Sequence, residues 1–158
     1  MCDHKGVTPL DELEWLNPDE IRLLRTSFVR MIPACEVRSE RFYERLFESD
    51  PSLRPLFPTD MESQNEKLTM MLASAIDLLD QRDKFVETCA ALGKRHAGYG
   101  ALRGHYDLVT RLLVECLVEE LEPSLSQAER SSWTKLLTLI SEFMLSGSGQ
   151  TEHAPRQG

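Results

Sequence analysis

The stretch LGKRHAGYG, residues 92–100, joins a histidine to a cationic pair and to two glycines that can end a helix. The apolar positions before it recur three or four residues apart, which is the spacing of one face of an α-helix. These positions, with the histidine, are Phe85, Cys89, Leu92 and His96. Lys94 and Arg95 then face water, whereas His96 ends the apolar face and points inward. The fold must therefore accommodate an imidazole at the inner end of an apolar helix.

Length and charge restrict the classes of protein to consider. The chain has 158 residues, 41% of them hydrophobic, which suits one globular domain. Its formal net charge of −8, from 26 acidic and 18 basic residues, argues against nucleic acid and anionic membrane surfaces as partners. No apolar run approaches the roughly 18 residues that span a bilayer. Residues 1–16, MCDHKGVTPLDELEWL, carry charges where a signal peptide would be apolar. We expect a cytoplasmic protein, a monomer or a weak dimer.

The cysteines do not indicate disulfides or a zinc site. No two of them form a C-x-x-C pair, and no Cys/His cluster has the spacing of zinc ligands. We expect free thiols in a reducing compartment, with Cys89 and Cys116 acting as small core residues. The four are Cys2, Cys35, Cys89 and Cys116.

The periodicity predicts an all-α protein without strands. Asn17 and Pro18 form a helix start signal, while residues 49–60, with three prolines, predict a corner containing a short helical turn. The expected helices span about 18–31, 34–48, 61–79, 82–97 and 103–121, and a last one opens within 124–130, capped by Ser124 or Ser126. The expected organisation is an N-terminal extension at 1–16, a helical domain at 17–146 and a disordered tail at 147–158.

Two polar side chains interrupt otherwise apolar helix faces. One is His96, and the other is Gln64, which lies one turn before Leu68. A buried polar group without a partner costs about 1–3 kcal/mol, so a polar group between the two helices would explain both. A haem iron could bind the neutral imidazole, whose other nitrogen would donate to a carbonyl or water. The alternatives remain a hydrogen-bonded core histidine and a glutamine at an exposed helix edge.

An ordered set of motifs resembles the globin family, in particular bacterial single-domain haemoglobins and the haem domain of flavohaemoglobins. The motifs occur in family order over roughly residues 18–145. They are FYERLF (42–47), DPSLRPLF (50–57), SQNEKL (63–68), LGKRHAGYG (92–100), GHYDLV (104–109) and SSWTKLL (131–137). The resemblance implies a globin fold, with helices packed around a haem pocket. The absence of C-x-x-C-H indicates non-covalent haem b.

The resemblance also assigns roles to single residues. It makes His96 the proximal ligand of a pentacoordinate iron, with Tyr43 and Gln64 on the distal side, where O2, NO or CO would bind. Further haem contacts that it implies are Phe57, Lys67, Leu68, Leu92 and Tyr106. Lys67 could reach a haem propionate, although a solvated lysine is the simpler interpretation.

A tyrosine and a glutamine that donate to O2 imply tight, slow-releasing binding, which suits nitric oxide dioxygenase activity or sensing better than oxygen transport. No segment resembles a reductase domain, so turnover would need a separate electron donor. Flavohaemoglobins have a proximal glutamate where this chain has Ser148, which we expect in the tail; Glu142 lies earlier.

Two other functions remain open. A gas sensor acting through a protein partner could use the apolar residues of the N-terminal extension, which could equally fold back on the domain. These residues are Val7, Leu10, Leu13 and Trp15. A haem-free regulator is the third hypothesis, and the presence of His96, Phe57 and Gln64 argues against it.

Overall fold

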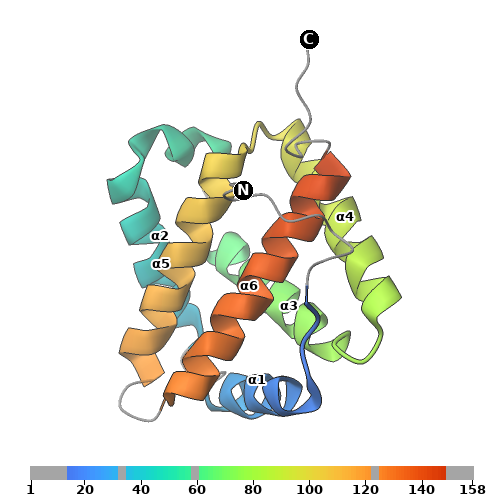
Figure 1. Cartoon of the computed structure of the whole chain (residues 1–158). Helices are drawn as coiled ribbons and strands as arrows, with labels where there is room; N and C mark the ends of the chain where they lie inside the picture. The colour runs from blue at the N-terminus through green and yellow to red at the C-terminus, as the bar shows by residue number, and fades with distance from the viewer. Residues whose placement is uncertain (1–13, 32–34, 58–60, 122–124, 149–158) are drawn as a thin grey trace, which may run out of the picture.

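The computed structural model describes residues 14–31, 35–57, 61–121 and 125–148, and in these ranges the chain is helical with no strand. The helices are α1 (Pro18–Met31), α2 (Cys35–Ser49), the 3-10 helix η3 (Pro51–Leu56), α3 (Met61–Asp77), α4 (Arg82–Gly98), α5 (Arg103–Leu121) and α6 (Gln127–Ser148). Figure 1 shows α6 between α5 and α4, with α1 crossing its first turns. The predicted all-α class is confirmed, as is the short helical turn between α2 and α3.

The first and last helices begin with the same reciprocal cap. Asn17 Oδ1 accepts from the Glu20 N–H at 2.8 Å, and the Glu20 carboxylate accepts from the Asn17 N–H at 2.9 Å. Ser126 and Glu129 repeat this arrangement at 3.0 and 2.9 Å. Each cap satisfies amide groups that a helix start leaves unpaired. Asn17 was predicted as a cap, and Ser126 is one of the two candidates for the last helix; Ser124 lies outside the described residues.

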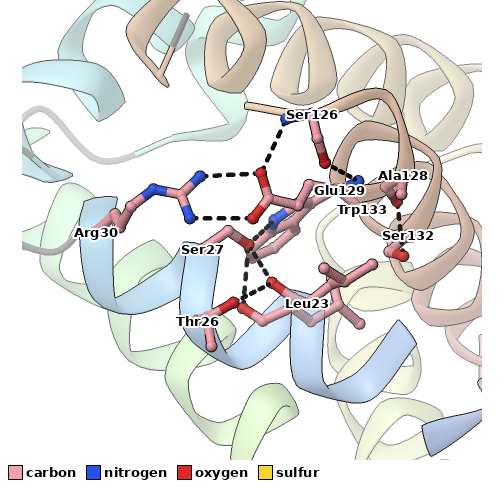
Figure 2. Close-up of polar contacts among 10 residues, drawn as sticks. Leu23, Thr26, Ser27, Arg30, Ser126, Ala128, Glu129, Ser132 and Trp133 are labelled. Atoms are coloured by element: carbon pink, nitrogen blue, oxygen red, sulfur yellow. Dashed lines mark hydrogen bonds and ion pairs between the residues drawn. The ribbon is translucent and has the colours of Figure 1, made fainter. Parts of the chain in front are cut away.

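The junction of α1 and α6 buries a polar network (Figure 2). Trp133 Nε1 donates to Ser27 Oγ at 2.8 Å, and that hydroxyl donates to the Leu23 carbonyl at 2.7 Å. Arg30 donates twice to the buried Glu129 carboxylate, at 3.0 Å each. The hydrogen bond from Arg30 holds the pKa of Glu129 below its ordinary value. Glu129 thus caps α6 and fixes α1 against it.

The core is built largely from the inward face of α6. The apolar residues of that face, three and four positions apart, are buried, and α4 is its most extensive neighbour. The buried residues of this face include Trp133, Leu136, Leu137, Ile140, Phe143 and Met144. Phe85 of α4 packs edge-on against Phe143, with ring centroids 6.2 Å apart. Helix α4 is therefore placed by its contact with α6.

Two helix ends differ from the sequence prediction. Helix α3 ends at Asp77 rather than at 79, and a turn follows in which Leu79 is still buried. Helix α6 continues to Ser148, beyond the boundary expected at 146, so the prediction that Ser148 lies in a tail is wrong. The reason is tertiary, because Gly147 lies directly on the Ala90 backbone of α4.

The segment before α1 folds back on the domain at Trp15, one of the two alternatives that the sequence left open. Trp15 packs edge-on against Phe85, with centroids 5.0 Å apart, and the Arg82 guanidinium lies 5.6 Å from its ring centre. The adjacent Leu16 is 4% exposed. Trp15 therefore belongs to the domain, while Val7, Leu10 and Leu13 lie outside the described residues. None of the described helices is long and apolar enough to cross a membrane.

Candidate functional site

Tyr43 of α2 lies in a cluster of aromatic rings. Its ring centroid is 5.6 Å from that of Phe57, directly after η3, and 6.1 Å from that of Phe47. The Phe47 and Phe57 rings meet edge-on at 5.4 Å. Tyr43 is 5% exposed, whereas the two phenylalanines are half-buried. The corner between α2 and α3 thus brings Tyr43 and Phe57 together, as expected of residues that share a site.

A hydrogen bond links Tyr43 to α3. Gln64 Nε2 donates to the Tyr43 phenol oxygen at 3.1 Å. Burial raises the pKa of Tyr43 to about 12, and the bond from Gln64 opposes part of that rise. The phenol is therefore neutral at physiological pH. Because its oxygen accepts from Gln64, its own proton is available to donate to a further acceptor.

The geometry of His96 determines which of its ring nitrogens carries a proton in the neutral tautomer. Nδ1 lies 2.9 Å from the carbonyl oxygen of Leu92, one turn earlier in α4. A carbonyl oxygen only accepts hydrogen bonds, so Nδ1 carries the proton. In a neutral imidazole, Nε2 then holds the free lone pair that a metal ion requires. The sequence prediction that one ring nitrogen donates to a backbone carbonyl agrees with this contact.

The end of α4 holds His96 between a helix and a tight turn. The His96 carbonyl accepts from the N–H groups of Tyr99 and Ala101, at 2.9 and 3.1 Å. Gly100 has a φ of +92°, a conformation that glycine adopts without strain. The Tyr99 ring lies edge-on to the imidazole, with centroids 5.8 Å apart. The glycine signal in LGKRHAGYG therefore corresponds to a real turn directly after the histidine.

The other predicted site residues have different environments. Leu68 and Leu92 are half-buried, whereas Lys67 is exposed. Tyr106 of α5 is 7% exposed, and its buried hydroxyl has no hydrogen-bond partner. Direct contacts thus join Tyr43, Phe57 and Gln64 on one side and His96 with Leu92 on the other.

Comparison with known proteins places this arrangement in a family. A family model described as Globin matches residues 40–144. The chain belongs to the globin family. That span includes Tyr43, Gln64 and His96, and it extends from α2 nearly to the end of α6.

Individual globins and globin-containing proteins resemble the chain at low identity. A flavohemoprotein of Vibrio cholerae is 19% identical over 137 residues, covering 85% of this chain and 35% of that protein. An uncharacterized globin-like protein of Aquifex aeolicus is 28% identical over 111 residues, covering 68% of this chain and 78% of that protein. A bacterial globin structure from Campylobacter jejuni superposes with a TM-score of 0.73 at 18% identity, covering 84% and 96% of the two chains. The chain spans about a third of the flavohemoprotein, and the structural likeness confirms the globin fold.

Family membership makes haem, in its usual form haem b, the cofactor of this globin and makes the chain a gas-binding protein. Its residues fit that cofactor. In the neutral tautomer that the Leu92 carbonyl favours, Nε2 of His96 is free to bind iron, and the buried Tyr106 hydroxyl lacks a partner. Apolar side chains from several elements stay half-buried, as expected where a flat apolar group packs on them. They include Phe47, Phe57, Leu68, Leu92 and Val109.

Sequence reasoning missed two buried residues of this globin. Asn65, next to Gln64 on α3, is 5% exposed, and its Oδ1 has no partner. Gly93 is buried three residues before His96. Asn65 gives no signal in the sequence, because a polar residue beside Gln64 predicts a solvated helix face. Gly93 stands out only as a glycine inside a helix, which indicates close packing without naming the partner.

Proposed function

We propose that this globin binds O2 reversibly at a pentacoordinate haem b iron held by His96, and that it consumes nitric oxide with electrons from a reductase. The observation that carries the proposal is the hydrogen bond from Gln64 to the Tyr43 oxygen, at 3.1 Å. It supports a direction for the network, in which Gln64 orients the phenol and Tyr43 donates to the gas.

The environment of Tyr43 favours a strong donor. The phenol is buried, its pKa of about 12 keeps it protonated, and three aromatic neighbours restrict its ring. Haem supplies the iron that binds the gas, and O2 carries partial negative charge when it binds there. A donor fixed in a low-dielectric site stabilises such charge without reorganising. Tight O2 binding with slow release then favours reaction with nitric oxide over transport.

The proposed supply of electrons by a reductase draws support from the flavohemoproteins of Vibrio cholerae and Candida albicans among the relatives. This chain differs from the flavohaemoglobin pattern on the proximal side, where that pattern has a glutamate. Glu142 pairs with Arg103 at 3.2 Å, and Ser148 Oγ donates to the Leu145 carbonyl at 2.8 Å. These side chains are engaged elsewhere, so we propose a neutral proximal imidazole held by the Leu92 carbonyl, without a carboxylate partner.

Absorption spectroscopy of the purified protein tests the proposal. The oxidised, reduced, O2-bound and CO-bound spectra should show one b-type haem, pentacoordinate when ferrous and gas-free. His96→Ala should abolish stoichiometric haem uptake or change the ligation state, whereas His105→Ala is the matched control. His105 accepts from the Leu102 N–H at 3.0 Å, as a helix-start residue does. A His96→Ala protein with wild-type Soret and visible bands would refute the ligand assignment.

One contact favours a gas sensor as the second candidate. Trp15 packs on Phe85 of α4, the helix that carries His96, and so connects the N-terminal segment to the proposed ligand. A sensor would bind gas with the same spectra but would not consume nitric oxide steadily. Measuring nitric oxide consumption under O2, with NADH and an added flavin reductase, separates the two functions.

A further inference from the structure

The backbones of α4 and α6 approach each other closely at two glycines. At Gly93, on α4, a Cβ atom would lie 1.8 Å from the Met144 carbonyl oxygen and 2.6 Å from its Cα. Real Cβ atoms do not approach other atoms this closely. The clashing atoms belong to the backbone, so rotating a side chain cannot relieve the overlap. Only glycine permits the two helices to meet as they do here.

A second glycine repeats the arrangement from the opposite helix. A Cβ on Gly147 of α6 would lie 2.1 Å from the Ala90 carbonyl oxygen and 2.5 Å from its Cα. Gly93 and Ala90 are three residues apart on α4, and so are Met144 and Gly147 on α6. Each helix therefore contributes one glycine and one carbonyl to the same crossing. The two contacts together fix both the spacing and the tilt of α4.

The imidazole cannot move independently of this backbone. His96 lies three residues after Gly93, just under one helical turn. The bond from Nδ1 to the Leu92 carbonyl ties the ring to the turn that contains Gly93. If α4 moves away from α6, Nε2 of His96 therefore moves with it.

We propose that Gly93 and Gly147 are positioning residues for the iron ligand: by letting α4 touch the α6 backbone, they set where His96 presents Nε2 to the haem. This inference rests on the proposed role of His96. It is separable from that role, because a histidine can ligate the iron from a displaced helix with a changed iron–nitrogen bond.

The test compares two glycine-to-alanine substitutions on α4. Gly93→Ala introduces the backbone clash. Gly98→Ala is the matched control, because nothing lies within 4 Å of a Cβ there. Alanine favours helix over glycine, so a loss seen only at Gly93 reports the contact with α6. The readouts are the Fe–His stretching band in the resonance Raman spectrum of the ferrous protein and the rate of haem transfer to excess apomyoglobin.

We expect Gly93→Ala to shift or split the Fe–His band and to release haem at least about tenfold faster, as overpacking strain of typical size would produce. Gly98→Ala should match the wild type in both. If Gly93→Ala does not fold, Gly147→Ala replaces it, because a side chain there meets the Ala90 backbone of α4 at the same crossing; its band should shift in the same sense.

Two results would overturn the inference. One is a folded, haem-loaded Gly93→Ala protein whose band and haem release equal those of Gly98→Ala. The other applies where Gly93→Ala does not fold: it is a haem-loaded Gly147→Ala protein whose band and haem release equal those of Gly98→Ala. A wild-type protein without an Fe–His band would refute the role of His96 itself. A normal wild-type band with unchanged variants would refute only the role of the glycines.

Discussion

Replacing Tyr43 by phenylalanine should accelerate O2 release. The substitution keeps the ring, and with it the packing against Phe57 at 5.6 Å and Phe47 at 6.1 Å, and deletes only the hydroxyl. Little cavity is created, so the change isolates the hydrogen bond. A bond to a charged acceptor contributes about 1.5–3 kcal/mol, which corresponds to roughly ten- to a hundredfold in rate. Tyr43 is 5% exposed, so the hydrogen bond would form away from bulk water, which favours the upper part of that range.

The effect should fall on dissociation rather than association, because the bond holds a gas molecule that has already bound. Stopped-flow displacement of O2 by CO measures the dissociation rate directly. CO carries little negative charge, so its own release rate should change much less. Tyr99→Phe is the control for loss of a phenol, because Tyr99 is 61% exposed.

Gln64→Leu tests the direction of the network. If Gln64 acts by orienting the phenol, its removal should accelerate O2 release less than Tyr43→Phe does. The double variant should then resemble Tyr43→Phe alone, because the two residues act through one donor. Unchanged or slower O2 release in Tyr43→Phe would show that the phenol packs or obstructs and does not donate. The preference for nitric oxide chemistry would then lose its physical basis.

Two further predictions concern stability. Burial raises the pKa of Tyr43 from 10.0 to about 12, so the folded state holds this proton more tightly than the unfolded chain does. The contribution of the protonated phenol to the free energy of unfolding is therefore complete below pH 10 and is lost as pH rises through about 12. Urea unfolding at increasing alkaline pH should therefore show a steeper loss of unfolding free energy in the wild type than in Tyr43→Phe; parallel losses would contradict the shifted pKa. Trp133→Phe should lower the unfolding free energy by about 1–3 kcal/mol, since it removes both the bond to Ser27 and buried volume. Thermal and urea unfolding check this value, and a change below about 0.5 kcal/mol would mean that the network in Figure 2 contributes little.

The helices and their inward faces could be derived from the sequence because their signals are local. Apolar residues three and four apart define a helix face wherever it packs, and the buried residues of α6 follow that pattern. The Asn17 cap is equally local, because its partner Glu20 is three residues away. The inward position of His96 follows from the same periodicity. The roles of Tyr43 and Gln64 came from the resemblance to globins, since periodicity alone would make Tyr43 an ordinary core residue.

What the tertiary structure decided depends on contacts between segments distant in sequence. Gln64 donates to a tyrosine 21 residues earlier, and no local pattern fixes which of the two is the donor. The end of α6 extends to Ser148 because Gly147 rests on the Ala90 backbone, although the residues there have the composition of a tail. Gly93 looks like a weak point in a helix until Met144 is seen against it. Helical propensity and periodicity are properties of one segment. The close approach of two helices depends on two segments that are distant in sequence, and only the packed fold brings these segments together.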